Sequence, residues 1–515
     1  MATGLPSLDF HLALTPYTPA DLPKSNPQLL EDFLKSTTAR AVYLFGLPDH
    51  LEITLDWLKA DPTRLLIVLE DDLGVIGAMQ DQIAQFHSHP QIHFRYISGA
   101  LDDELEECAR DFPVDRIDLY SLPHKKKPKN LLLKLLRKTV LWHATFTESL
   151  QSHLLAKNTW ESLRQWPKSC LVNNWGGLFE KIPVIICGAG PSLAPAIPQL
   201  KKIQNEALII AGGSAIRALH HFGVQPHLAI AIDPNDREYD CVKGSVPYTT
   251  PFLYGSRLSS RVFELFQGPL GYIKTGTGGP LEAYFEDQAG ITVPSIGPDM
   301  GRESLSVTTL AVSLAYFLGC DPITLVGVDL AYSASRHYAH QKASIDLEKL
   351  KAEKHVTDQL LWRKGKNGTR AATLTKWIME AKTLSSYAKK HKDRRFIDAS
   401  EEGLPLPGFE RGSIELRGHY DIAKRLEKAF KGSKLPQVSS EELLQSLKRS
   451  SAFCGKLARG EGHSALHETE LEEELAYKLL LAPIHRSLNH CFRHVSGEEK
   501  KWEYLREAAQ AFLPL

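Results

Sequence analysis

The chain has 515 residues, of which 43% are hydrophobic and 24% are charged, an ordinary composition for a globular protein. That length exceeds what one hydrophobic core usually holds, so it predicts two or three domains. Lysine plus arginine and aspartate plus glutamate both number 61. The net charge therefore gives no general case for binding nucleic acid or an acidic surface.

The seven cysteines are scattered and form no C-x-x-C pair, which argues against a zinc site and against a disulfide framework. Reduced thiols of this kind fit the cytosol. The first residues lack the basic and apolar segments of a signal peptide, and no apolar run reaches the ~18 residues of a membrane span. We therefore expect a cytoplasmic protein without a transmembrane segment.

Residues 1–38 are Pro-rich and are expected to be an irregular lead-in. Residues 39–150 are predicted to form a Rossmann-like α/β domain, with its first strands at Ala41–Phe45 and Leu65–Leu69. The second strand runs into Glu70-Asp71-Asp72, where a Rossmann unit places the acid that holds a ribose. The turn after the first strand lacks G-x-G-x-x-G, so the alternative is that these acids cap the next helix.

The segment Lys181–Asp236 carries a repeated pattern of strand, small or polar turn, and helix. Its first strand, Val184–Cys187, is followed by Gly188-Ala189-Gly190-Pro191-Ser192 and by an amphipathic stretch to Lys202. The second strand (207–211) runs into Gly212-Gly213-Ser214, and the third (228–232) ends at Asp233. Strands alternating with helices predict a doubly wound parallel sheet, which binds ligands at the carboxyl ends of its strands. The first turn can offer N–H groups to an anion; the alternative is that its glycines only permit a tight turn.

Further candidates follow later in the chain. Ser306 opens a predicted buried helix over 304–318, and Gly327 and Asp329 follow a predicted strand at Ile323–Val326. Residues 341–395 are expected to be mostly helical, broken at 365–368. The tail, 411–515, is expected to be a helical cap or an oligomerisation domain without evident chemistry.

Five pieces of the central segment, predicted as a domain over 151–410, carry a resemblance to a known family. They are PVIICGAGPSL (183–193), IIAGGSAIRALHHFGVQPHLAIAID (209–233), SVTTLAVSLAYFLGCDPITLVGVDLAYS (306–333), NGTRAATLTKW (367–377) and FIDASEEGLPLPG (396–408). The segment resembles the motility-associated factor family of bacterial glycosyltransferases, whose core domain is shared with archaeal 6-hydroxymethylpterin diphosphokinases.

The resemblance implies a fold related to bacterial sialyltransferases and a CMP-activated nonulosonic sugar as the donor. It implies transfer to a Ser or Thr of a protein such as flagellin, with no required cofactor and no metal ligand. We expect the donor to contact Gly188, Ala189, Gly190, Pro191, Ser192, Gly213, Ser214, Asp233, Ser306 and Gly327.

One difference separates the two branches of this resemblance. The diphosphokinase branch typically reads T-D-L-D-G after its third strand, with acids suited to Mg²⁺ and a triphosphate. This chain has Ala231-Ile232-Asp233-Pro234-Asn235-Asp236 instead, which favours the glycosyltransferase. Asp233, Asp236 and Asp329 keep a magnesium-dependent diphosphokinase open as the alternative, and a non-catalytic nucleotide-binding scaffold is a third possibility.

Transfer from a CMP-sugar needs a base that takes the proton of the acceptor hydroxyl, and a neutral histidine suits that role. His337 is the first candidate and His340 the second, because both follow the Asp329 strand end. Arg336 is predicted to hold the carboxylate or phosphate, and Asp329 to orient a ligand or the loop. The alternatives are a surface arginine, a turn cap at Asp329 and a helix cap at Ser306.

Overall fold

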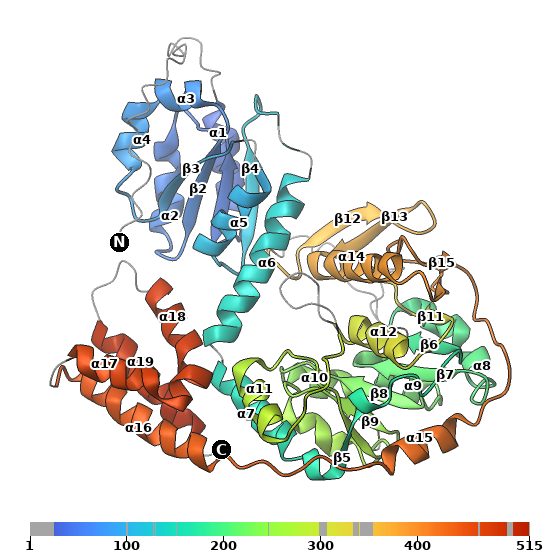
Figure 1. The fold of residues 1–515 in the computed structure, drawn as a ribbon. Helices are drawn as coiled ribbons and strands as arrows, with labels where there is room; N and C mark the ends of the chain where they lie inside the picture. The colour runs from blue at the N-terminus through green and yellow to red at the C-terminus, as the bar shows by residue number, and fades with distance from the viewer. Residues whose placement is uncertain are drawn as a thin grey trace. The chain divides into compact units, whose positions relative to one another are not determined.

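The chain packs into two compact units in a computed structural model (Figure 1). The small unit comprises Met1–His143 with Leu347–Leu360, and the large unit comprises Ala144–Asp346 with Leu361–Leu515. The finer division into four parts stays a prediction. The structure describes residues 25–98, 101–126, 128, 130–150, 152–245, 247–297, 306–332, 339, 354–461, 464–491 and 498–513.

The small unit contains a four-stranded parallel sheet in the order β3-β2-β1-β4. Its strands, all predicted from apolar runs, are β1 (Ala41–Phe45), β2 (Leu65–Glu70), β3 (Ile92–Tyr96) and β4 (Ile117–Ser121). Its helices are α1 (Pro27–Ser36), η1 (Leu51–Thr54), α2 (Leu55–Lys59), α3 (Leu73–Ala78), α4 (Gln80–Phe86), α5 (Leu101–Asp111) and most of α6 (Leu131–Leu150).

Helix α1 corrects the expectation of an irregular lead-in. The side chain of Asn26 accepts a hydrogen bond from the Gln28 N–H, and Pro27 occupies the first helical position, where its missing N–H costs nothing. Leu30 and Leu34 bury one face of the helix in the core of the small unit.

The large unit is built on a nine-stranded parallel sheet in the order β15-β14-β11-β6-β7-β8-β9-β10-β5. Its strands are β5 (Ser169–Leu171), β6 (Val184–Cys187), β7 (Leu208–Gly212), β8 (Leu228–Ala231), β9 (Phe252–Tyr254), β10 (Leu270–Tyr272), β11 (Ile323–Val326), β14 (Phe396–Asp398) and β15 (Glu410–Arg411). The α/β fold class and the predicted central strands are confirmed.

Helices cover both faces of this sheet, which explains why its strands read as unbroken apolar runs. Successive residues of a strand point to opposite faces: Val184 and Ile186 join one hydrophobic cluster, and Ile185 and Cys187 join the other. The helical elements of the large unit are α7 (Ser152–Leu163), η2 (Trp166–Lys168), η3 (Val172–Asn174), η4 (Pro191–Ala196), α8 (Ile197–Leu200), α9 (Ser214–His221), α10 (Arg237–Val242), η5 (Ser260–Leu265), α11 (Gly279–Gln288), α12 (Val307–Phe317), α14 (Thr375–Lys390), α15 (Ile422–Phe430), α16 (Glu441–Ala458), α17 (Ser464–Glu473), η6 (Tyr477–Leu481), α18 (Ala482–Cys491) and α19 (Glu498–Phe512). None of the helices in the described ranges is long and apolar enough to cross a membrane.

Two sequence-based expectations of helix are wrong in part. Residues 360–374 form a hairpin of β12 (Leu360–Lys364) and β13 (Arg370–Leu374) around a turn in which Gly368 has φ 76°. The stretch after Gly190 is largely the 3₁₀ turn η4, and α8 has only four residues. Prolines in this stretch lack the N–H that a continuous α-helix needs.

The sheet changes its winding direction between β6 and β11. From β6 the chain moves to one side through β7, β8, β9 and β10, and from β11 it moves to the other side through β14 and β15. Helices leave the two neighbouring strands in opposite directions there, so a crevice opens at their carboxyl ends.

Candidate functional site

We call the place between β6 and β11, where the winding direction changes, the switch point. Two turns meet there, one after β6 and one after β11. The N–H of Gly188 donates to the carbonyl of Val326 at 2.7 Å, and the N–H of Gly190 donates to the carbonyl of Gly327 at 2.8 Å. The turn predicted from the G-x-G-P-S motif is therefore hydrogen-bonded to the end of β11, another predicted strand. Its amides at 188 and 190 are already used inside the protein.

The glycines of these turns are required by close approach. A Cβ atom on Gly188 would overlap the carbonyl oxygen of Gly327, and a Cβ on Gly190 would lie 2.5 Å from Oδ2 of Asp329. Gly327 itself has φ 69°, which side chains other than glycine rarely adopt. These contacts establish a structural role for the glycines, and their role in donor binding stays a prediction.

Asp329 holds the Gly-rich turn in place. Its Oδ2 atom accepts the N–H of Ser192 at 2.9 Å, and its carbonyl accepts the N–H of Leu404 at 2.8 Å. The side chain is buried, and its Oδ1 atom has no partner among the described residues. Burial raises the pKa of Asp329, and the hydrogen bonds from Ser192 oppose that shift. An unsatisfied buried carboxylate oxygen is costly, so this atom is a candidate contact for a ligand.

The switch cleft beside Asp329 has a volume of about 150 Å³. It is lined by Gly188, Ala189, Gly190, Thr308, Gly327, Val328, Asp329, Leu330, Ala331, Trp377 and Glu380. Ala189, Gly190, Gly327 and Asp329, all predicted site residues, thus share one cavity with the first turn of α12 and with α14.

Ser306 caps α12, as the helix-cap alternative predicted. Its side chain accepts the N–H of Thr309 at 3.1 Å, and the hydroxyl of Thr309 accepts the N–H of Ser306 at 2.8 Å. The Ser306 hydroxyl also donates to Oε1 of Glu380 at 2.8 Å. Burial raises the pKa of Glu380, and hydrogen bonds from Ser306 and Thr308 oppose the shift.

A buried ion pair that the sequence did not predict lies next to the switch cleft. Nζ of Lys366, in the hairpin turn, lies 2.8 Å from Oδ2 of Asp398 at the end of β14, and both side chains are fully or almost fully buried. Burial lowers the pKa of Lys366, and Asp398 opposes that shift. The turn after β11 is fixed through Ser400, whose hydroxyl accepts the N–H of Val328 at 3.0 Å.

The remaining predicted strand ends lie along the same edge. Val307 of α12 packs directly on Gly212, leaving no room for a Cβ there, so the start of α12 covers the end of β7. Gly213, with φ 51°, precedes Ser214 at the start of α9. Asp233 is exposed and accepts the backbone N–H and the side-chain amide of Asn235 at 2.9 and 2.7 Å, which closes a local turn.

Glu238 is a candidate that the sequence analysis did not find. It lies on α10 with its side chain buried, and a Cβ on Gly213 would be 3.5 Å from its Oε1 atom. That oxygen has no partner in the described part of the chain. Burial raises the pKa of Glu238 to about 8, with a smaller contribution from Asp233. Nothing local in the sequence marks it, because only the fold buries it.

The predicted base and its neighbours, Arg336, His337 and His340, lie outside the described residues. Ala339 of the same predicted loop is described, and its N–H donates to the carbonyl of Ala189 at 2.8 Å. At that position the chain returns to the Gly-rich turn. The catalytic roles of Arg336 and His337 stay predictions.

Two further expectations bear on other ligands. At the corresponding edge of the small unit, Asp72 caps α3 by accepting the Gly74 N–H at 2.8 Å, which confirms the helix-cap alternative for that acid. Within the described ranges, no group of three or more His, Cys, Asp or Glu is placed to hold a metal ion. Magnesium stays a prediction tied to the diphosphokinase alternative.

Comparison with known proteins agrees with this architecture. Residues 157–335 match the family described as "6-hydroxymethylpterin diphosphokinase MptE-like", so this part of the chain is similar to an MptE-like domain. No curated protein sequence matches the chain. The chain is similar to a solved motility-associated factor (MAf) glycosyltransferase from Magnetospirillum magneticum AMB-1, with 17% identity and a TM-score of 0.50 over 92% of this chain and 78% of that one. The resemblance stated from the sequence motifs is confirmed for the domain and the fold.

Proposed function

We propose that the chain is a glycosyltransferase that moves a nonulosonic, sialic-acid-like sugar from a CMP-sugar to a hydroxyl of a protein Ser or Thr or of a glycan. The carrying observation is the switch cleft, where the Gly-rich turn and Asp329 meet. The likeness of the fold to a solved glycosyltransferase supports the reaction class. The cytoplasm, as the compartment, and flagellin, as an example of the acceptor, belong to this proposal.

The nucleotide end of the donor is placed against Ala189 and the turn around it. The Gly188 and Gly190 amides are occupied, so the cleft offers the remaining backbone and the side chains of Thr308 and Glu380 to the donor. Asp329 positions the turn through Ser192 and presents Oδ1 to a ligand hydroxyl. His337 removes the acceptor proton as cytidylate leaves, and Arg336 binds an anionic group of the donor.

The diphosphokinase alternative is kept because the matched family carries that name. It would transfer the pyrophosphoryl group of magnesium-bound ATP to the hydroxyl of a pterin-like alcohol, with AMP as the leaving group. The two reactions need different nucleotides, so the ligand that stabilises the folded protein separates them. Stabilisation by CMP without magnesium supports the glycosyltransferase, and stabilisation by ATP only with magnesium contradicts it.

The decisive test replaces Asp329 by Asn and measures CMP binding by thermal shift and sugar transfer from CMP-nonulosonate. Asn keeps an oxygen for the Ser192 N–H but loses the carboxylate, so we expect about a tenfold loss of CMP affinity or transfer with little change in melting temperature. Asp103→Asn, an exposed position on α5, is the matched control. Equal CMP binding and equal transfer by Asp329→Asn and Asp103→Asn would remove Asp329 from the site.

A further inference from the structure

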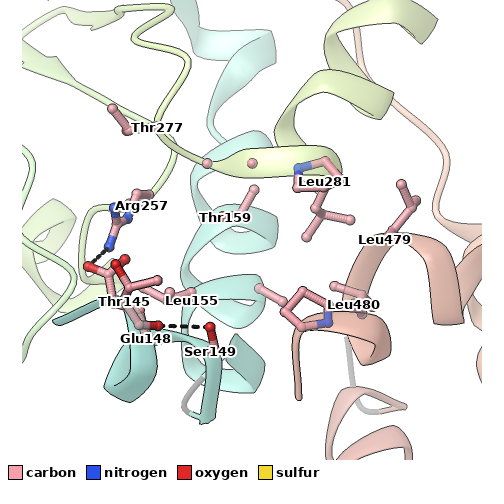
Figure 2. A pocket seen from close by; sticks show the side chains of 15 residues that line it. Thr145, Glu148, Ser149, Leu155, Thr159, Arg257, Thr277, Leu281, Leu479 and Leu480 are labelled. Carbon is pink, nitrogen blue, oxygen red and sulfur yellow. Dashed lines mark hydrogen bonds and ion pairs between the residues drawn. The ribbon is translucent and has the colours of Figure 1, made fainter. Parts of the chain in front are cut away.

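A second cavity lies at the same sheet edge, beyond the carboxyl ends of β9 and β10. Its volume is about 230 Å³, and it shares no lining residue with the switch cleft. Figure 2 shows Arg257 and Glu148 on one side of it and Leu281, Leu479 and Leu480 on the other. We call it the Arg257 pocket.

Arg257 gives this pocket a buried positive charge. The residue follows β9 and is only 7% exposed. One terminal nitrogen lies 2.5 Å from Oε1 of Glu148, whereas Nε is buried and has no partner among the described residues. A guanidinium is built to bind an oxyanion through two parallel N–H donors, so the present pairing leaves part of this fork unused.

The start of α11 adds a second feature suited to an anion. Thr277, Gly278 and Gly279 line the pocket where this ten-residue helix begins, and no side chain caps it. The Gly278 N–H is taken by Oε2 of Glu282 at 2.8 Å, but the following first-turn amides have no acceptor within a helix. The helix dipole favours negative charge at this end.

Apolar side chains from distant parts of the chain form much of the remaining wall, beside the hydroxyls of Thr145, Ser149 and Thr159. Leu155 belongs to α7, whereas Leu479 and Leu480 belong to the π-helix η6. π-Helical turns are rare and frequent at functional sites. The apolar walls strengthen a charge–charge contact by lowering the local dielectric. The C-terminal helical region, which the sequence left without chemistry, thereby supplies one side of the pocket.

The identity of the occupant follows from charge and size. Glu148 is a half-exposed carboxylate, 47% accessible at its side chain, and it contacts Arg257 through one oxygen. The cavity is smaller than the roughly 300–1,000 Å³ that drug-sized ligands occupy, so, like the switch cleft, it can enclose only part of a large ligand. One buried cation beside leucine side chains suits an anionic head group with a small apolar body.

We propose that the Arg257 pocket binds a small ligand that carries a carboxylate or phosphate group, which takes the place of Glu148 on the Arg257 guanidinium. This site is separate from the switch cleft and does not depend on glycosyl transfer. Leucine side chains from α11 and η6 contact the apolar part of the ligand.

The test uses the full chain and three probes of one shape: benzoate, phenyl phosphate and the neutral benzamide. Binding is measured by calorimetry and thermal shift. We expect benzoate or phenyl phosphate to bind and benzamide not to bind, and the tighter of the two anions identifies the head group. Glu148→Gln removes the competing carboxylate and should tighten anion binding about tenfold.

Arg257→Gln should abolish anion binding, and its melting temperature reports whether the fold is kept. Asp329→Asn should leave binding of these probes unchanged, so failure at the switch cleft is distinguishable from failure here. The proposal is overturned if neither anion binds the wild type or Glu148→Gln. It is also overturned if benzamide binds as well as the anions, or if Glu148→Gln leaves anion affinity unchanged.

Discussion

The acidic side chains at the carboxyl edges of the two parallel sheets differ in how fully their oxygens are hydrogen-bonded. In the small unit, Glu70 at the end of β2 accepts the N–H groups of Leu47, Asp71 and Asp72, each at 2.9 Å. Lys125 pairs with the same carboxylate and also lies 2.8 Å from Asp71. Both oxygens of Glu70 are therefore satisfied by the protein itself.

In the large unit, two acids at the corresponding edge each keep a carboxylate oxygen that accepts no hydrogen bond from the described residues. Asp329 has one satisfied oxygen and one without a described partner, and Oε1 of Glu238 is in the same condition. The buried ion pair of Lys366 and Asp398 lies next to the turn after β11. Acids that are fully paired at a sheet edge stabilise the fold. Buried carboxylate oxygens without a partner destabilise the fold, but they are free to contact a ligand.

The largest expected effect comes from breaking the buried pair. Lys366→Met leaves the Asp398 carboxylate without its cation and should lower the free energy of unfolding by about 3–5 kcal/mol. Denaturant titration measures it, with Lys364→Met, an exposed position of the same hairpin, as the control. An equal and small effect of both substitutions would show that the ion pair does not support this edge.

A smaller loss is expected at the closed edge of the small unit. Glu70→Gln replaces a carboxylate that accepts three N–H groups and pairs with Lys125, so we expect about 2–3 kcal/mol of destabilisation. The melting of the small unit, followed by hydrogen exchange of β1 and β2, reports it. Unchanged protection in these strands would contradict the description of Glu70 as a structural acid.

The smallest effect is expected at Glu238 and depends on pH. Because the folded-state pKa is raised to about 8 above its ordinary value, the folded protein keeps a proton that the unfolded chain has released. Its contribution to stability is therefore lost as the pH rises from about 4.5 to about 8. Glu238→Gln removes this loss and should be more stable than the wild type near pH 8.5 by at least about 1 kcal/mol, the value of roughly one pKa unit, with little difference near pH 4.5.

Denaturant titrations at the two pH values provide the measurement. The comparison with Glu70→Gln is internal: the same substitution on the two sheet edges should destabilise one unit and stabilise the other at high pH. If Glu238→Gln were less stable than the wild type at both pH values, Glu238 would have a hydrogen-bond or ion-pair partner in the folded protein.

Local patterns in the sequence predicted much of the fold. Val184–Cys187 and Leu65–Leu69 are apolar runs bounded by turn residues, and burial on both sides of a parallel strand leaves that mark on consecutive positions. The hairpin at 360–374 was missed because β12 is only half buried and β13 runs from exposed to buried positions, so no long apolar run distinguishes them from a charged helix. The 3₁₀ turn at Pro191–Ala196 was missed because the apolar spacing outweighed the prolines.

The candidate site divides in the same way. Turn chemistry is local, so the sequence alone predicts which residues stand at strand ends, among them Gly188, Gly190, Gly327 and Asp329. Three further features come from the folded chain: these strand ends adjoin at the switch point, Lys366 pairs with Asp398, and Glu238 and Arg257 are buried. Burial and pairing depend on chain segments far apart in sequence, and a charged residue has the same letter whether it is solvated or enclosed.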